Sequence, residues 1–265
     1  MKIVRALLPL LLFVFGCSPS TNSDSLIQET KAFEVYFVSD TPRGFKLFSE
    51  VREFEAISSG FATEVLSQLI SGELQPLDSD YSNLWDETNS LNQVIISGAT
   101  ATVDLSLGSL NVGSEGEIRA IEQIVWTLTS VTPSVTTVRF LVDGEVVETF
   151  AGHVDTSVDF KRVPYYEVLN PIQIESISNG QDLKNPVEIT GKACTFEANV
   201  VWELFERGNL VDQGFTSADS ACPQRSNWKV DLGRLSPGDY LFVAQEFSAE
   251  DSSLFAIDSK DFSVK

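Results

Sequence analysis

From residue 171 to the C-terminus, short runs of β-branched and aromatic residues constrain the fold more than any other feature. Turn signals such as Asn179-Gly180 and Asn185-Pro186 separate the runs. Strands at this spacing are typical of two packed antiparallel sheets. We therefore predict a seven-stranded immunoglobulin-like β-sandwich over residues 171–265, with Trp202 in its core. The expected strands are 172–177, 187–193, 199–206, 210–216, 228–232, 240–247 and 255–264.

Residues 32–150 predict a separate α/β domain, because helical and strand periods alternate there. Apolar residues recur at helical spacing from Ala62 to Ile70, and Ser114 with Glu117 forms a capping-box pattern before a second helix that ends by Pro133. Strands are expected at 33–38, 48–54, within a hairpin at 93–107, at 138–142 and in a return at 145–150. The core order is αββαβ, with two helices on one face of a sheet. The chain is thus a two-domain α+β protein, with residues 151–170 between the domains.

Five blocks of the first domain, taken in order, resemble the GerMN family of sporulation and spore germination. They are 35–37 (VYF), 66–72 (LSQLISG), 101–105 (ATVDL), 123–129 (QIVWTLT) and 138–144 (VRFLVDG). That family is similar to ring-building-motif domains, whose sheets and helices can stack into assemblies. The resemblance implies envelope assembly rather than chemistry. It also singles out the polar residues Gln123, Thr127, Thr129 and Arg139, for which local hydrogen bonding at a helix–sheet junction is the alternative role.

The second domain resembles the Gmad type of GerMN-associated immunoglobulin-like domain. The matching blocks are 174–176 (IES), 179–180 (NG), 187–193 (VEITGKA), 196–200 (FEANV), 237–240 (PGDY) and 248–251 (SAED). Gly191, followed by Phe196-Glu197-Ala198, is the most specific part. A Gmad domain directly behind a GerMN domain strengthens both assignments.

Residues 1–17 read MKIVRALLPLLLFVFGC and predict a lipoprotein signal peptide. Two basic residues precede an apolar stretch, 6–15, which is too short to span a bilayer core of about 30 Å as a helix. Val14-Phe15-Gly16-Cys17 resembles a bacterial lipobox, so we expect cleavage before Cys17 and lipidation of its thiol and amine. An ordinary signal peptide is the alternative. Segment 18–31 is polar and is expected to be a flexible tether to the membrane, which places the protein in the periplasm or on the cell surface.

Charge and cysteine content limit the classes of function that this chain can have. With 18 Lys+Arg against 38 Asp+Glu, the net charge of −20 argues against nucleic-acid binding and against attachment to anionic lipid through a basic patch. Beside Cys17, the even pair Cys194 and Cys222 predicts a disulfide in an oxidising compartment. His153 is the single histidine, and no nucleophile elbow or phosphate-binding glycine loop occurs. We therefore predict no metal, no cofactor and no catalytic residue, although an envelope hydrolase that uses two carboxylates stays open.

The leading functional hypothesis is a non-enzymatic binding or scaffold protein of the bacterial cell envelope. Its partner would be another envelope protein or a second copy, joined through a sheet edge. The alternative is a peptidoglycan or wall-glycan module, in which Tyr81, Trp85 and Trp126 would stack on sugars. Tyr81 and Trp85 lie in the long connection 73–91, which also carries several carboxylates. Clustered carboxylates are candidate calcium ligands, but their spacing here does not match an EF-hand loop. The simpler role for Trp85 is to plug the edge of the core.

Overall fold

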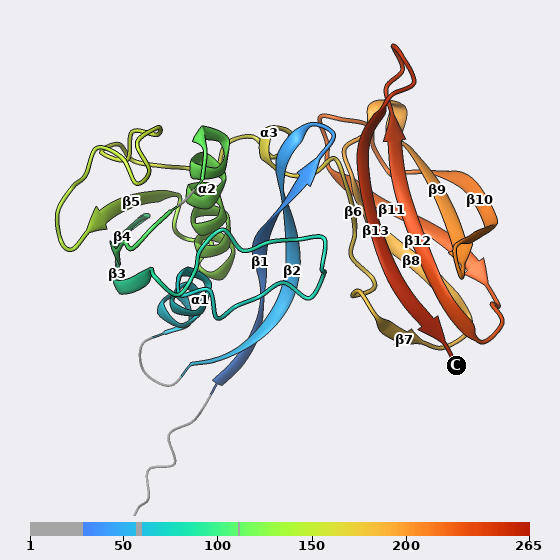
Figure 1. The fold of residues 1–265 in the computed structure, drawn as a ribbon, viewed down its shortest axis with the longest axis horizontal. Coiled ribbons are helices and arrows are strands. Elements are labelled where there is room, and N and C mark those ends of the chain that lie inside the picture. Colours follow the sequence, from blue (N-terminus) through green and yellow to red (C-terminus); the bar gives the residue numbers. More distant parts are fainter. Residues whose placement is uncertain (1–28, 57–59, 111) are drawn as a thin grey trace, which may run out of the picture.

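A computed structural model describes residues 29–56, 60–110 and 112–265, and it shows two domains side by side (Figure 1). The first domain contains β1 (Glu29–Thr41), β2 (Gly44–Ala56), α1 (Phe61–Ile70), β3 (Ser90–Ser97), β4 (Thr100–Ser106), α2 (Ser114–Val131) and β5 (Thr137–Val142). The second contains β6 (Ile172–Ile174), β7 (Gln181–Leu183), β8 (Val187–Ala193), β9 (Asn199–Glu206), β10 (Asn209–Ser217), β11 (Ser226–Gly233), β12 (Gly238–Phe247) and β13 (Leu254–Val264). One-turn helix α3 (Tyr165–Val168) lies between the domains, and a short 3-10 turn, Phe196–Ala198, precedes β9.

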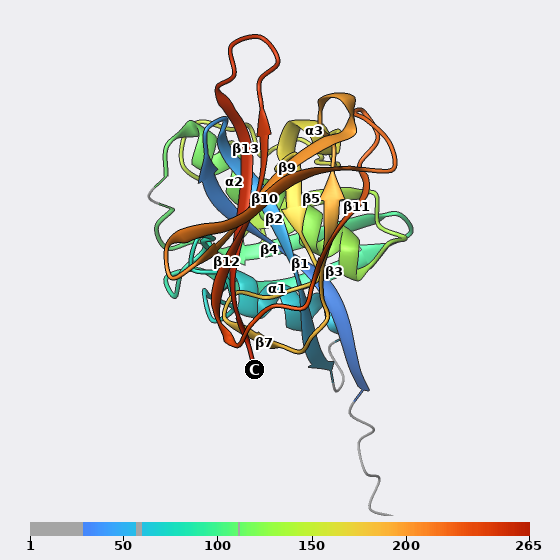
Figure 2. The same ribbon diagram turned by 90° about the vertical axis from the view of Figure 1, so that its right-hand side faces the viewer.

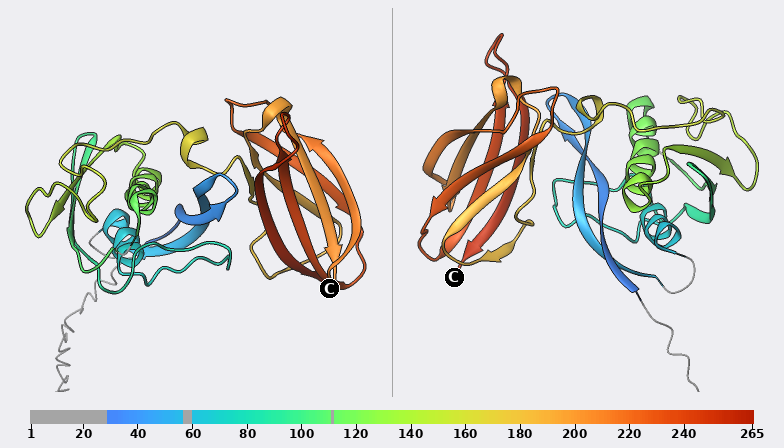
Figure 3. Two further views of the ribbon diagram at one scale, coloured as in Figure 1. Left: turned by 45° about the horizontal axis from the view of Figure 1, so that its top comes forward. Right: turned by 180° about the vertical axis from the view of Figure 1, so that it is seen from behind.

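The first domain has three layers. Strands β3, β4 and β5 form a sheet in that order, with β3 antiparallel and β5 parallel to β4. Helices α1 and α2 lie between this sheet and the long β1–β2 hairpin (Figure 3). The predicted αββαβ order is confirmed. The predicted return strand at 145–150 is wrong, because in this segment only Glu145 makes a bridge, to Val142.

Both helices are held by apolar burial. Val65, Leu66, Leu69 and Ile70 of α1 are fully buried, as their spacing predicts. Burying a side chain of this size contributes about 1.5–3 kcal/mol. They join a core that includes apolar residues of β1, β2, β4, β5 and α2. Gly72 follows α1 with a φ of 72°, which suits the sharp turn into the loop.

The capping box predicted at Ser114 does not form, because Glu117 has other partners. Gly113 is the N-cap of α2 and makes no side-chain cap bond. The carboxylate of Glu117 is fully buried and accepts four backbone N–H bonds, of 2.7–3.2 Å, from Phe150, Ala151, His153 and Val154. A long-range bond set has replaced the local cap, and it fixes the segment that follows β5.

The second domain is an immunoglobulin-like sandwich (Figure 2). One sheet has the order β10-β9-β12-β13-β7, and the other has the order β11-β8-β6. All seven predicted strands are present. The structure adds β7, which pairs in parallel with the end of β13 and carries too few residues to show a period in the sequence.

Aromatic stacking fills the sandwich. Phe242 stacks on both Trp202 and Trp228, with ring centroids 5.9 and 6.3 Å away. Trp202 packs against the core but is only partly buried, and the fully enclosed indole is that of Trp228. A Cβ at Gly191 would lie 2.0 Å from the carbonyl oxygen of Gln173 and 2.7 Å from the Trp228 ring, so this position requires glycine.

The predicted disulfide between Cys194 and Cys222 is present. Cys194 directly follows β8, whereas Cys222 lies in the loop between β10 and β11. The backbone N–H of Cys222 also donates to the carbonyl oxygen of Thr195, at 3.1 Å. The bridge therefore joins a strand end to a loop.

Candidate functional site

A buried polar cluster joins the two domains. Asp258 and Lys260 lie on β13, and the side chains of Asp78 and Tyr81 reach them from the loop that follows α1. The Lys260 ammonium contacts the Asp78 carboxylate and donates to Tyr81 Oη at 2.6 Å and to Asp258 Oδ1 at 3.3 Å. The Tyr81 hydroxyl donates to Asp258 Oδ1 at 2.9 Å. None of the four side chains is more than 6% exposed, so the cluster fixes how the domains meet.

The carboxylates of this cluster compensate the charge of the buried Lys260 ammonium. Burial lowers the pKa of Lys260, but Asp258 and Asp78 raise it by more, so the ammonium stays charged. Burial, followed by the negative charges of Asp258 and Asp78, raises the pKa of Tyr81 well above its ordinary value of 10.0. The neutral phenol is therefore the donor to Asp258. Asp258 Oδ2 accepts the backbone N–H of Ile174 at 2.7 Å, which ties both sheets of the sandwich to the cluster.

Further bonds hold the loop of the first domain in place. Glu50 of β2 accepts the backbone N–H groups of Leu77 and Asp78, at 2.9–3.0 Å. The Tyr81 ring stacks on Phe48 with centroids 4.5 Å apart. Outside the cluster, the Gln173 amide of β6 donates to Ser49 O of β2 at 2.6 Å. Separate contacts therefore fix the same arrangement of the domains.

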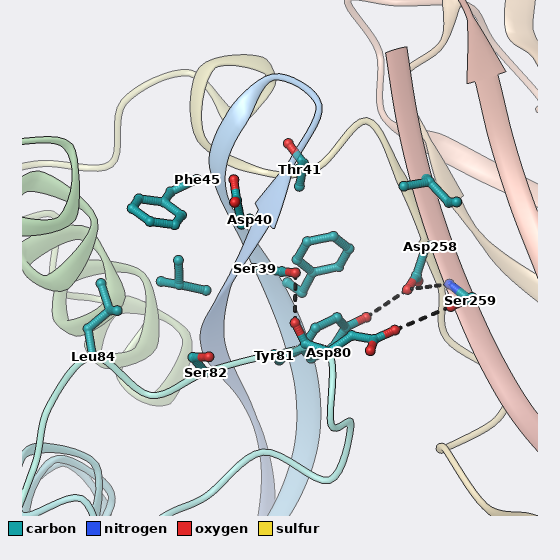
Figure 4. Close-up of a pocket in the computed structure, with 13 residues that line it drawn as sticks. Ser39, Asp40, Thr41, Phe45, Asp80, Tyr81, Ser82, Leu84, Asp258 and Ser259 are labelled. Atoms are coloured by element: carbon teal, nitrogen blue, oxygen red, sulfur yellow. Dashed lines mark hydrogen bonds between the residues drawn. The ribbon is translucent and has the colours of Figure 1, made fainter. Parts of the chain in front are cut away.

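A pocket of about 510 Å³ opens beside the cluster, between the hairpin tip and β13 (Figure 4). The side chain of Ser39 donates to the Asp80 carbonyl oxygen at 2.7 Å, and Ser259 contacts the Asp80 carboxylate at 3.4 Å. Asp40 and Asp80 are exposed at its rim, and Phe45 lines its wall. The pocket is acidic, and its polar groups mostly bind one another.

The free outer edge of β3 is a second candidate site. Among the described residues, β3 pairs only with β4, so its other edge has no strand partner. Its sequence, SLNQVIIS, contains no charged residue and no proline. Ile95 and Ile96 are 52% and 43% exposed. An uncharged, partly apolar edge is a template for pairing with another strand. β3 lies on the side of the first domain away from the sandwich (Figure 1).

The structure corrects the expectation of an exposed aromatic surface. Tyr81, Trp85 and Trp126 are 6%, 1% and 4% exposed. Tyr81 belongs to the polar cluster, and Trp85 packs in the first core with its indole N–H donating to the Ala120 carbonyl oxygen at 3.1 Å. Rings buried to this degree offer no open face to a sugar. Trp85 therefore plugs the core, which was the simpler of its two expected roles.

The remaining sequence-selected residues have these positions. Gln123 bonds to Asn83 and Leu84, Thr127 Oγ1 accepts the N–H of Tyr36, Thr129 bonds to Val125 and Arg162, and Arg139 pairs with Asp159. These bonds are structural and lie within the first domain and the connecting segment, and the pair of Arg139 with Asp159 is exposed at the surface. His153 is exposed. Cys17 lies outside the described residues, and in the described part no helix is long and apolar enough to cross a membrane.

Residues 34–148 match the model of the Germane family, described as "Sporulation and spore germination". Residues 168–253 match Gmad2, described as "Immunoglobulin-like domain of bacterial spore germination". Neither description names an enzymatic activity. Among curated proteins, none matches the chain.

Solved structures give distant likenesses. A Clostridium perfringens protein provisionally described as a lipoprotein is 21% identical, with a TM-score of 0.36 over 51% of this chain and 88% of that one. The tandem GerMN domains of the sporulation protein GerM from Bacillus subtilis are 23% identical, with a TM-score of 0.43 over 51% and 47% of the two chains. The first GerMN domain alone gives 22%, 0.41, 50% and 98%. At such scores these likenesses support no functional argument.

Proposed function

Because this chain carries a GerMN domain followed by a Gmad2 immunoglobulin-like domain, we propose that it is a non-enzymatic scaffold protein of the bacterial cell envelope. Lipid on Cys17 would hold it at the outer face of the cytoplasmic membrane or in the outer membrane. Its role is to bind another envelope protein or a second copy of itself. The carrying observation is the free, uncharged edge of β3.

An edge strand binds a partner strand through its backbone. The unpaired N–H and C=O groups of β3 supply hydrogen bonds, and the side chains set specificity. Ile95 and Ile96 point to opposite faces of the sheet, so an added strand gains apolar contact on both faces. In a chain with a net charge of −20, eight residues without charge also lack the repulsion that blunts most sheet edges.

The fixed domain junction supports a scaffold role. The buried cluster around Lys260 and the Gln173–Ser49 bonds set one orientation of the sandwich relative to the first domain. A partner bound at β3 would therefore be held at a defined distance and direction from the second domain.

We would test the edge by crosslinking in cells with the full-length lipoprotein. The variant Ile95→Lys places a charge on the edge, and Phe215→Lys places one on β10, an edge strand of the second domain where Phe215 is 77% exposed. We expect Ile95→Lys to abolish crosslinks to one reproducible protein, or to the chain itself, and Phe215→Lys to leave them. Crosslinks that survive Ile95→Lys would refute the edge. Capture of wall fragments alone would favour the glycan module.

The anchor is tested separately. Cys17→Ser removes the acceptor of the lipid, so the variant should leave the membrane fraction. If Cys17→Ser stays bound to the membrane as the wild type does, the lipid anchor is wrong, whatever the crosslinking shows.

A further inference from the structure

A second groove between the domains collects positive charge. It has a volume of about 580 Å³ and is lined by Tyr36 and Trp126 of the first domain, Arg162 and Tyr165 of the connecting segment, and Arg225 of the second domain. Lys192 also lines the groove and pairs with Glu175 at 3.4 Å, which leaves the two arginines against the single carboxylate of Glu34. A cationic excess is unusual in a chain with a net charge of −20.

The two arginines are held in place without a carboxylate. Arg162 Nε donates to Thr129 Oγ1 at 2.6 Å and Nη2 to the Trp126 carbonyl oxygen at 2.8 Å, with the guanidinium 4.4 Å from the Trp126 ring centroid. Arg225 Nη1 donates to the Asn170 carbonyl oxygen at 2.6 Å and Nη2 to Gln173 Oε1 at 3.3 Å. Among the described residues, the ion pairs of 4.0 Å or less include neither arginine.

Donors in this groove outnumber their acceptors. A guanidinium carries five N–H groups, and each arginine uses two of them in these bonds. Trp126 is 4% exposed, and its indole N–H has no acceptor in the part of the chain that the structure describes. Because that nitrogen is itself closed to solvent, the donors open to a ligand in the groove are those of the arginines. Burial also lowers the pKa of Arg225, although the negative charge of Glu175 acts in the opposite direction.

We propose that this groove binds the terminal carboxylate of a short peptide. Nη1 of Arg162 and Nε of Arg225 take no part in the bonds above, so each guanidinium can still donate to a carboxylate. The contact of Arg162 with the Trp126 ring also limits the side-chain entropy that is lost on binding. Val163, Pro164 and Leu169 offer an apolar wall for the residue next to the carboxylate. A phosphate polymer fits less well, because Glu34 and Glu175 repel a chain of negative charges. The site is independent of the β3 edge.

The test titrates full-length protein in detergent with N-acetyl-alanyl-alanine, its C-terminal amide, and inorganic phosphate. Isothermal titration calorimetry gives Kd, and tryptophan fluorescence gives a second signal because Trp126 lines the groove. We expect the acid to bind with a Kd of about 1 mM, as its size suggests, and the amide at least tenfold more weakly. Arg162→Gln should weaken the acid about tenfold, with a smaller loss for Arg162→Lys, which keeps the charge without the fork.

Controls separate binding from folding. Arg234→Gln removes an exposed arginine of the second domain outside the groove, and it should leave Kd unchanged. Arg162→Gln loses the bonds to Thr129 and Trp126 and should be less stable in urea, but its circular dichroism without denaturant should match that of the wild type. The proposal is overturned if acid and amide bind alike, if nothing saturates, if Arg162→Gln and Arg234→Gln bind equally, or if phosphate binds as tightly as the peptide.

Discussion

Replacing Lys260 by methionine tests whether the polar cluster holds the domains together. Lys260 is 5% exposed, and its ammonium is the only cation that the ion pairs of the described residues give to Asp78 and Asp258. Methionine keeps much of the side-chain volume but leaves two buried carboxylates without a counter-charge. Removing one partner of a buried ion pair costs about 3–5 kcal/mol, far more than the same change at the surface.

The matched control is Lys229→Met in the same domain. Lys229 pairs with Glu188 at 2.9 Å, but their side chains are 61% and 51% exposed. Solvent and salt screen such a pair, so we expect little measurable change. Urea unfolding of the full-length chain, followed by fluorescence and by circular dichroism, should show a lower midpoint for Lys260→Met. The transitions of the two domains should also separate, because their coupling is lost.

A second comparison tests whether uncompensated charge causes the loss of stability in Lys260→Met. If the loss comes from uncompensated carboxylates, the neutral variant Asp78→Asn/Asp258→Asn/Lys260→Met should recover part of it. Equal midpoints for Lys260→Met and Lys229→Met would refute the reasoning. So would a Lys260→Met protein that is more stable than the wild type, since apolar groups would then pack better than the cluster.

Three further outcomes are expected. Gly191→Ala should destabilise the second domain by about 1–3 kcal/mol in urea unfolding, because its Cβ would lie 2.0 Å from a carbonyl oxygen. Gly238→Ala in the same domain should cost much less, because its Cβ would meet the end of the flexible Glu206 side chain at 3.0 Å; equal effects would contradict the packing argument. Glu117→Gln should cost about 2 kcal/mol or more and speed hydrogen exchange at residues 150–154, whereas the exposed Glu145→Gln should do neither. Because burial raises the pKa of Tyr81, the folded state keeps a proton that the unfolded chain releases above pH about 10, so stability should fall as pH rises past that value, and Tyr81→Phe should flatten the fall; an unchanged slope would contradict the buried phenol.

Local patterns predicted the elements well. Apolar spacing placed Val65, Leu66, Leu69 and Ile70 on the buried face of α1, and all four are 0% exposed. Turn signals located seven of the eight strands of the sandwich, and the missed strand, Gln181–Leu183, is too short to show alternation. The block resemblances identified both families, which the matches over residues 34–148 and 168–253 confirm. These features could be predicted because they depend on residues that are close together in the sequence.

The sequence pattern did not predict contacts between residues that lie far apart in the chain. Ser114 and Glu117 have the spacing of a cap, but the backbone groups that bind Glu117 come more than 30 residues later. The junction did leave a signal in the sequence. Asp258 and Lys260 lie on the same face of the strand as Ala256, Phe262 and Val264, and all five are buried. Charges at inward positions of a strand indicate a buried polar contact. The sequence did not show that the contact would come from Asp78 and Tyr81, whose partners on β13 lie 182 and 177 residues later.

Of the two proposed sites, the groove depends on the polar junction between the domains, whereas the β3 edge does not. The groove needs Trp126 from one domain and Arg225 from the other, so its geometry depends on the domain orientation that the Lys260 cluster fixes. The β3 edge lies within the first domain alone. Apolar contacts allow sliding, whereas ion pairs with short hydrogen bonds select one register. Lys260→Met should therefore weaken peptide binding in calorimetry but leave crosslinks through β3 in place. Loss of both together would mean that the first domain depends on the junction for its own fold, and equal retention of both would mean that the other bonds suffice to orient the domains.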